Sequence, residues 1–382
     1  MDKMLDRICF AQQTRKQLEV HPVVALLGPR QCGKTTLAKK IIEDYSGNTH
    51  SFDLEDPADI LALSEPMRVL ERLSGLVIID EIQRLPDLFP ILRVLVDKKQ
   101  AQYLILGSAS RHLIQQSSET LAGRIGYIEL TPFQLQEVKL SSTLLIRGGF
   151  PRAYLAKTEE HSYLWREAYI QTFLEQDIPN LGFRVPALML RRFWMMLSHV
   201  HGQLLNMHAL GNSLSISGHT VRHYLDILSG TFMIRVMPPW HSNIKKRQVK
   251  TPKIFFRDSG VLLTLLGIQT EEALLRHPQL GAIWEGFALE QLITYFDLRA
   301  EEAFFWRTAQ GAELDLFVFL NGKPIGFEFK FSDAPKVTKS MHQALSDLAL
   351  EHLYIIYPGK RSIPLGDKIT ALGLDTAIEM VF

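Results

Sequence analysis

A glycine-flanked segment, Gly28 to Thr36, constrains the possible folds of this chain more than any other stretch. It reads GPRQCGKTT and follows an apolar run, Val23 to Leu27, that has the composition of a buried strand. The spacing G-x-x-x-x-G-K-T between a strand and a helix is typical of a loop that turns its backbone N–H groups toward phosphates. We therefore expect an α/β fold built on a parallel sheet, with a nucleotide at this loop.

The loop also assigns roles to its side chains. Lys34 would reach the β and γ oxygens of ATP, and the Thr35 hydroxyl would be a ligand of Mg²⁺. A glycine-rich turn without a ligand is the alternative, and the strand–loop–helix context disfavours it. The expected nucleotide-binding residues are Gly28, Pro29, Arg30, Gln31, Cys32, Gly33, Lys34, Thr35 and Thr36.

A second apolar run, Leu76 to Ile79, ends in two carboxylates, Asp80 and Glu81. This pattern indicates a Walker B strand, in which Asp80 would bind Mg²⁺ through water and Glu81 would orient and deprotonate the attacking water. The alternative is that the carboxylates cap the next helix. A third run ends in Ser108, which we expect beside Asp80 on a neighbouring strand, close enough to sense the γ-phosphate.

Composition narrows the class of protein. The chain has 382 residues, of which 46% are hydrophobic and 22% charged, which suffices for two or three domains with ordinary cores. No apolar run approaches the roughly 18 residues of a membrane span, and the N-terminus lacks a signal-peptide pattern, so we expect a cytoplasmic protein without membrane partners. Cys9 and Cys32 have no metal-ligand or redox spacing, and we expect no disulfide.

The middle of the chain predicts a winged helix-turn-helix. Residues 206–214 and 220–228 have helical apolar spacing, residues 215–218 form the turn, and residues 232–236 favour a strand. The segment from Lys245 to Arg257 then has six basic residues and no acidic one, which favours contact with a nucleic-acid backbone. The alternative is a packing module with a solvated basic face.

Two β-like runs joined by Asn321-Gly322 predict a hairpin with a two-residue type I′ turn. In that register Asp315 lies opposite Glu328 and Glu313 lies opposite Lys330, with all four side chains on one face. Opposed carboxylates repel unless a cation lies between them, so we expect Asp315 and Glu328 to bind Mg²⁺.

Further groups complete this expected metal site. A third acid would come from the preceding helix, with Glu285 the better candidate and Glu290 the alternative. Lys330 would activate the attacking water or stabilise the developing charge. The alternative is a surface hairpin whose charges are solvated or paired.

These motifs together resemble known families. GPRQCGKTTLA, the segment Asp53 to Pro57, VIIDEIQ, LILGSAS and LAGR resemble AAA-type P-loop ATPases related to archaeal and origin-recognition ATPases. The later part is similar to the uncharacterised domain that commonly accompanies them, in which a winged helix precedes a fold similar to the PD-(D/E)xK nucleases. The resemblance covers nearly the whole chain.

The resemblance implies ATP and Mg²⁺ as cofactors, DNA as a partner and a homo-oligomer. Arg124 would be an arginine finger acting on a neighbouring subunit's nucleotide, with Arg111 as the rival. It implies an ATPase core at residues 1–140, a helical lid at 141–200, a winged helix at 201–265 and a nuclease-like domain at 266–382.

Two classes of function fit. The first is an ATP-hydrolysing protein that acts on DNA, with its nucleotide state coupled to the winged helix and to a metal-dependent nuclease-like domain. The second is a nucleotide-switched regulatory or scaffolding protein whose inactive C-terminal domain binds DNA or protein without cutting.

Overall fold

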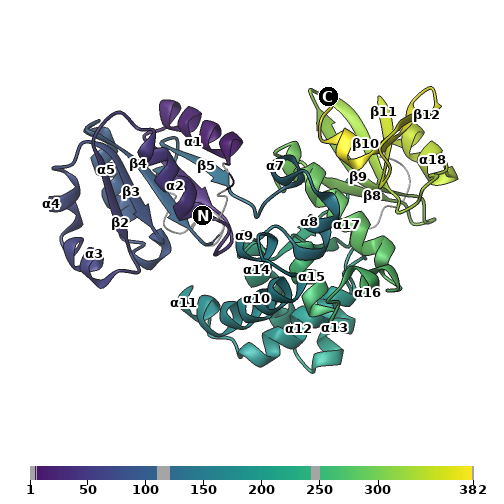
Figure 1. Cartoon of the computed structure of the whole chain (residues 1–382), viewed down its shortest axis with the longest axis horizontal. Helices are drawn as coiled ribbons and strands as arrows, with labels where there is room; N and C mark the ends of the chain where they lie inside the picture. The colour runs from purple at the N-terminus through teal and green to yellow at the C-terminus, as the bar shows by residue number, and fades with distance from the viewer. Residues whose placement is uncertain (1–4, 6, 110–120, 242–249, 381–382) are drawn as a thin grey trace. The chain divides into compact units, whose positions relative to one another are not determined.

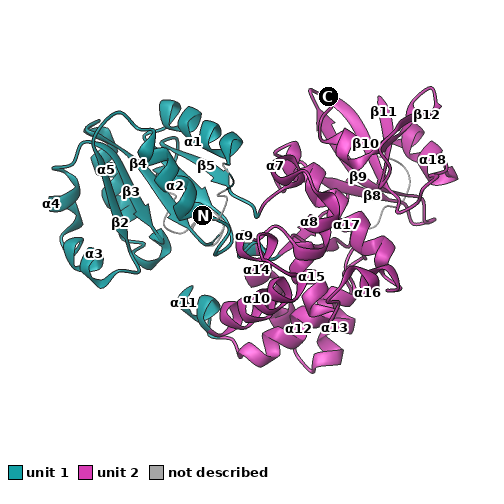
Figure 2. Cartoon of the chain, viewed as in Figure 1, with its two compact units in different colours: residues 1–132, 176–184, 230–233 teal, residues 133–175, 185–229, 234–382 magenta. Residues whose placement is uncertain are grey.

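The computed structural model describes residues 5, 7–109, 121–241 and 250–380. The chain divides into two compact units, coloured in Figure 2: unit 1 comprises residues 1–132, 176–184 and 230–233, and unit 2 comprises residues 133–175, 185–229 and 234–382. Among the described residues, no helix is long and apolar enough to cross a membrane. The chain therefore enters unit 1 three times, which places two later segments in the unit that carries the phosphate loop.

Unit 1 is built on a parallel five-stranded sheet with strand order β2-β3-β4-β1-β5 (Figure 1). Its strands are β1 Val23–Leu27, β2 Thr49–Asp53, β3 Gly75–Asp80, β4 Ala101–Gly107 and β5 Ile125–Glu129. All five residues of β1 are buried, because helices cover both faces of the sheet and successive side chains point to opposite faces. The expected α/β fold with a P-loop parallel sheet is confirmed.

Two separate cores form on the two faces of this sheet. Val24 and Leu26 pack with residues of α1 Ile8–Val20 and α2 Lys34–Glu43. Their neighbours in β1 pack on the opposite face, with residues of α5 Leu88–Asp97. The remaining helices described between the first and the last strand are α3 Pro57–Ala62, α4 Pro66–Leu70 and the 3₁₀ turn Ile82–Arg84.

Unit 2 contains most of the later helices. In chain order the helices described between unit 1's sheet and strand β8 are α7 Leu135–Val138, α8 Ser141–Arg147, α9 Pro151–Tyr154, α10 Glu159–Thr172, a π-helical turn Phe173–Asp177, α11 Ile178–Asn180, α12 Ala187–His199, α13 Met207–Leu214, α14 Gly218–Gly230, α15 Ser259–Leu265, α16 Glu271–Leu275 and α17 Leu280–Tyr295. Short α11 lies in a segment assigned to unit 1.

Helices α13 and α14 form a helix–turn–helix pair followed by a two-stranded ribbon. The Asn206 side chain accepts the Ala209 N–H and begins α13, and Ser215 ends it with φ 55°. After α14, strand β6 Ile234–Met237 pairs antiparallel with β7 Lys253–Phe256. Strand β7 falls in the stretch that the sequence indicated only as a basic run.

The last part of unit 2 is a six-stranded mixed sheet with order β12-β13-β11-β10-β9-β8. Its strands are β8 Phe304–Arg307, β9 Glu313–Leu320, β10 Lys323–Phe329, β11 His352–Tyr357, β12 Ser362–Gly366 and β13 Ile369–Gly373. Strand β10 pairs antiparallel with β9 and parallel with β11. Helix α18 Lys339–Asp347 packs on this sheet through Met341 and Ala344, and α19 Leu374–Ala377 follows β13.

The β9–β10 hairpin has the expected register. Leu316 pairs with Phe327 and Val318 with Ile325, and the turn residues Asn321 and Gly322 have φ values of 50° and 76°. Both turn residues therefore lie in the left-handed region that a type I′ turn requires. Continuing the register by one pair brings Asp315 opposite Glu328.

Candidate functional site

The loop between β1 and α2 has the tight geometry of a phosphate cradle. Gln31 and Gly33 adopt left-handed backbone conformations, with φ values of 62° and 103°. A Cβ on Gly28 would lie 2.0 Å from the Leu130 carbonyl oxygen, so only glycine fits there. Cys32 is buried in the loop and, like Cys9, is a free thiol, as the sequence predicted.

Lys34 is buried, and its ammonium is held by the loop itself. Its Nζ donates to the carbonyl oxygens of Gly28 and Pro29, at 2.9 Å each. Both partners are neutral, so no carboxylate has to be displaced before the lysine binds an anion. One residue later, the Thr35 hydroxyl donates to Asp80 Oδ2 at 2.7 Å. The hydroxyl and the carboxylate that were expected to share Mg²⁺ therefore lie side by side.

The carboxyl ends of β3 and β4 bring the remaining expected groups together. Ser108 Oγ donates to Glu81 Oε2 at 3.2 Å, and Gln83 Nε2 donates to Ser108 Oγ at 3.0 Å and also to Glu81. Glu81 has φ 54°, a strained conformation for glutamate of the kind that clusters at functional sites. Ser108 lies beside this carboxylate, and Gln83 is a member of the site that the sequence motif contained but our prediction did not assign.

Burial raises the pKa of Asp80 above its usual range, although the Thr35 hydrogen bond opposes that shift. The nearby Glu81 carboxylate raises it further. A divalent cation bound by Asp80 would remove this penalty. The residues present therefore fit a Mg²⁺ ion held by Thr35 and Asp80.

Arg30 has carboxylate partners that the sequence did not suggest. Its Nη1 donates to Asp177 Oδ1 at 2.6 Å, and its Nη2 forms an ion pair with Glu55. Asp177 belongs to the segment 176–184 that returns to unit 1. Burial raises the pKa of Asp177, and Arg30 opposes this shift.

Arg124 lies at the amino end of β5, the opposite edge of the parallel sheet from the phosphate loop. Its guanidinium pairs with Asp97 through Nε at 2.9 Å and Nη2 at 3.3 Å, and the side chain is 38% exposed. Arg124 is therefore placed away from its own chain's loop. Its rival, Arg111, lies outside the described residues.

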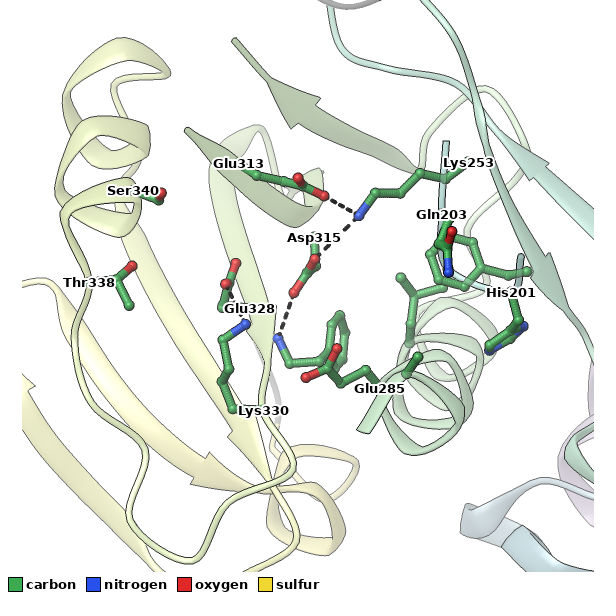
Figure 3. A pocket seen from close by; sticks show the side chains of 15 residues that line it. His201, Gln203, Lys253, Glu285, Glu313, Asp315, Glu328, Lys330, Thr338 and Ser340 are labelled. Atoms are coloured by element: carbon green, nitrogen blue, oxygen red, sulfur yellow. Dashed lines mark hydrogen bonds and ion pairs between the residues drawn. The ribbon is translucent and has the colours of Figure 1, made fainter. Parts of the chain in front are cut away.

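A second site is a pocket of about 440 Å³ in unit 2, shown in Figure 3. It is lined by residues 201–203 after α12, by residues of β7, α17, β9 and β10, and by the beginning of α18. Charged side chains dominate it, and they are Lys253, Glu285, Glu313, Asp315, Glu328 and Lys330. The four hairpin residues that the register predicted to share a face thus reach one pocket.

Their pairing differs from the expectation. Glu313 pairs with Lys253 and, at 3.0 Å, with Arg307, whereas Lys330 pairs with Glu328 Oε1 at 2.9 Å. Lys253 Nζ also lies 3.5 Å from Asp315 Oδ1, and Asp315 Oδ2 accepts the Phe329 N–H at 3.1 Å. The sequence predicted only which residues lie opposite each other, and the ion pairs differ from that register because a lysine from β7 enters the pocket from outside the hairpin.

The same contact corrects the interpretation of the basic segment. Lys253 is buried, and Arg257 is 3.7 Å from Glu290, so neither side chain is free for a phosphate backbone. Residues 242–249, which include Lys245, lie outside the described part of the chain. The sequence favoured contact of this run with a nucleic-acid backbone, with a solvated face as the alternative, whereas Lys253 in β7 and Arg257 directly after it form ion pairs within the protein.

Glu328 has one paired and one unpaired carboxylate oxygen. Oε1 accepts from Lys330, while Oε2 is buried without a hydrogen-bond partner among the described residues. Burial raises the pKa of Glu328 strongly, and the nearby Asp315 carboxylate raises it further. Burial alone would lower the pKa of Lys330, but Glu328 and Asp315 more than offset it, so the pKa is raised and the lysine stays protonated.

Glu285 lines this pocket, and Glu290 does not. Burial, followed by the charge of Asp315, raises the pKa of Glu285 from 4.5 to about 7. Glu290 instead accepts two hydrogen bonds from Arg235, at 2.5 Å and 3.0 Å. The alternative of Glu290 as the third acid is therefore wrong, because its charge is already compensated in a structural pair.

The pocket has the donors for a cation, although its geometry is not closed around one. Within the described ranges, no three His, Cys, Asp or Glu side chains converge at metal-ligand spacing. The buried, unpaired Glu328 Oε2 beside Asp315 and Glu285 is nevertheless an acceptor set that suits a hard cation such as Mg²⁺.

Comparison with known proteins divides the chain in three. Residues 20–139 match a family described as an AAA domain, residues 138–272 a domain of unknown function (DUF8612), and residues 280–377 a domain of unknown function (DUF4143). The uncharacterized proteins Rv2008c of Mycobacterium tuberculosis and Mb2031c of Mycobacterium bovis are each 47% identical over 376 residues, which is 97% of this chain and 84% of theirs.

Among solved structures, the Walker-type ATPase PABY2304 of Pyrococcus abyssi has a TM-score of 0.48 at 14% identity, covering 69% of this chain and 96% of that one. The ORC1 protein of Aeropyrum pernix in complex with DNA has a TM-score of 0.36 at 13% identity, covering 71% and 94%.

Proposed function

This chain belongs to the protein family of the two mycobacterial relatives and contains an AAA domain, and from that premise we propose that it binds and hydrolyses ATP and acts on DNA. One observation carries the ATPase proposal. Lys34, the Thr35–Asp80 pair and the Glu81–Ser108 pair meet at the carboxyl edge of the sheet in unit 1. Phosphoryl transfer needs little more than such positioned charges.

In this proposal each group has a role. The loop backbone and Lys34 bind the polyphosphate, while Thr35 and Asp80 hold Mg²⁺. Glu81 orients and deprotonates the attacking water, and Ser108 positions Glu81 and responds to the γ-phosphate. Arg124 acts on the nucleotide of a neighbouring copy, since it lies at the edge of the sheet away from its own loop.

Action on DNA is supported by the helix–turn–helix pair and its ribbon, which have the arrangement of a winged helix. His219 and Arg222 on α14 are exposed, and His223 is half-buried. The carboxylate pocket supports a metal-dependent nuclease-like domain. Its elements α17, β8, β9, β10, α18 and β11 follow one another along the chain, with an acid on β9 and a Glu-x-Lys on β10. Asp315, Glu328 and Glu285 would hold Mg²⁺, and protonated Lys330 would stabilise developing charge rather than act as a base.

The ATPase proposal is tested with Glu81→Gln. We expect this variant to bind ATP normally and to turn it over at least about 100-fold more slowly, the usual contribution of a general base. Glu65→Gln is the matched control, because Glu65 is an exposed carboxylate that pairs with Arg68.

The proposed action on DNA is tested by measuring ATP turnover with and without DNA. Unchanged ATP turnover and undetectable DNA binding would count against it.

A second function is favoured by Lys253. Because this lysine already neutralises Glu313 and Asp315, the pocket can be stable without metal and can serve a nucleotide-switched regulatory or scaffolding protein that does not cut. Metal-dependent DNA cleavage by the wild type, Asp315→Ala and Lys330→Ala distinguishes the two. Cleavage lost in both variants but kept in Lys339→Ala, an exposed neighbour, supports the nuclease. Equal residual cleavage in all of them indicates contamination and supports the regulator.

A further inference from the structure

Arg30 lies inside the phosphate loop, yet its partners are carboxylates of the protein. It is two residues beyond Gly28, and its guanidinium joins Asp177 at 2.6 Å and Glu55. A loop whose backbone is arranged to bind phosphate thus presents a guanidinium that is occupied by the protein's own anions. Guanidinium binds carboxylate and phosphate in the same bidentate manner, so the two compete directly.

The position of Arg30 indicates which phosphate it would meet. Its partner Glu55 also pairs with Arg84 at 3.3 Å. The residue before Arg84, Gln83, donates to Glu81, the carboxylate proposed to act on the water that attacks the γ-phosphate. Arg30 therefore lies on the γ side of the site, where ATP has a phosphoryl group and ADP has none.

Asp177 cannot lose Arg30 without a further change. Its side chain is 6% exposed, and a buried carboxylate without a cation is strongly unfavourable. The residues that follow it are tied to it, since the Leu181 N–H donates to the Asp177 carbonyl at 3.1 Å and Ile178 is fully buried. If Arg30 leaves, segment 176–184 has to move so that Asp177 reaches water.

We propose that Arg30 is the residue that distinguishes ATP from ADP, and that Asp177 competes with the γ-phosphate for its guanidinium. In the absence of a triphosphate, Arg30 holds Asp177 and segment 176–184 in place. With ATP bound, Arg30 binds the γ-phosphate, and the segment is released. This inference rests on the proposed ATP-binding function and adds a specificity and switching role to one loop residue.

The test measures the affinities of ATPγS and ADP for the full chain. Arg30→Ala is expected to lower the affinity for ATPγS by about tenfold, the effect of one charge-assisted contact, and to leave the affinity for ADP unchanged. Asp177→Asn is expected to raise the affinity for ATPγS by about threefold or more, because the carboxylate that competes for Arg30 is gone. The affinity for ADP should again be unchanged. Arg84→Ala is the matched control, because Arg84 also contacts Glu55, at 3.3 Å, but lies outside the loop.

Limited trypsin digestion supplies a readout that is independent of affinity. Arg184 is exposed at the end of the segment, so cleavage there reports its release. In the wild type we expect cleavage with ATPγS and protection with ADP, and in Asp177→Asn cleavage with both. The inference is overturned if Arg30→Ala loses affinity for ATPγS and ADP equally, or if wild-type cleavage at Arg184 is the same with both nucleotides. If wild type and Lys34→Ala both fail to bind any nucleotide, the proposed function itself is wrong.

Discussion

The nucleotide site of unit 1 and the carboxylate pocket of unit 2 each contain a buried lysine, Lys34 and Lys253, but the two lysines have opposite kinds of partner. Lys34 donates to two neutral backbone carbonyls. Lys253 and Lys330 are held by carboxylates instead. The ammonium of the first site is therefore not neutralised by a carboxylate and can bind an anion, whereas the lysines of the second site are already paired with carboxylates.

The carboxylates of the two sites also differ in whether they have hydrogen-bond or ion-pair partners. In the pocket, Glu328 Oε2 stays unpaired and Glu285 is kept partly protonated by burial and by Asp315. These are groups that a cation would stabilise. In unit 1, the carboxylates near the loop are satisfied by Thr35, Ser108 and Arg30. We propose that the first site is suited to a polyphosphate and the second to a metal ion.

The largest effect is expected for Lys253→Met. Removing one partner of a buried ion pair typically costs about 3–5 kcal/mol, and here Asp315 loses its ammonium partner while Glu313 keeps only Arg307. The free energy of unfolding in urea measures this loss. Mn²⁺ should raise the free energy of unfolding of the variant more than that of the wild type, since the ion replaces the missing ammonium charge. Lys253→Arg is the control, and an unchanged unfolding free energy in Lys253→Met would show that the pocket does not depend on this charge.

Lys34→Ala should have the reverse pattern. Its partners are carbonyls rather than charges, so the unfolding free energy should fall by less than about 1 kcal/mol, the net contribution of ordinary hydrogen bonds. ATP affinity should fall at least about 100-fold, which corresponds to about 2.7 kcal/mol. Calorimetric titration with ATP and Mg²⁺ measures it, with exposed Lys39→Ala as the control. A stable variant that still binds ATP would remove the contrast between the two sites.

The features that the sequence predicted are local. The phosphate loop is recognised from nine consecutive residues, and the hairpin register follows from counting outward from Asn321-Gly322. Parallel strands β3 and β4 end at the same edge, and Ser108 there contacts Glu81, the residue after Asp80. For these features, spacing alone determines proximity.

The features that were missed are contacts between distant residues. Arg30 and Asp177 are 147 residues apart, and Lys253 and Asp315 are 62 apart. A basic residue in a basic run has the same sequence signal whether it is solvated or buried. Whether Lys253 is exposed or paired therefore depends on the path of β7, which the sequence did not predict. Glu285 and Glu290 lie on one helix, but five residues turn a helix by about 140° beyond one full rotation, which sends one side chain to the pocket and the other to Arg235.

The pH dependence of the carboxylate pocket is a smaller effect. Glu285 has its pKa raised from 4.5 to about 7, so the folded protein keeps a proton there that the unfolded chain releases. The free energy of unfolding without metal should therefore fall as the pH rises through this window. Mn²⁺ affinity should rise over the same range, by about fivefold between pH 6 and pH 7, because the ion competes with one proton whose pKa is about 7.

Electron paramagnetic resonance of free Mn²⁺ measures this affinity at each pH. Glu285→Gln removes the titrating group and should flatten the dependence, although Glu328, whose pKa is also raised, keeps part of it. Glu290→Gln is not a suitable control, since it breaks the pair with Arg235, and exposed Glu302→Gln serves instead. A profile for Glu285→Gln that matches the wild type would place the titrating group elsewhere.

The smallest structural effect is expected for Arg124→Ala. Its pair with Asp97 is exposed, so the unfolding free energy should change by less than about 1 kcal/mol. ATP affinity should also be unchanged, because Arg124 lies at the far edge of the sheet from the loop. Turnover per chain in the wild type should increase with protein concentration as copies associate, and in Arg124→Ala it should stay at the dilute value. A loss of turnover that is equal at all concentrations would assign the arginine to its own subunit, against its placement in unit 1.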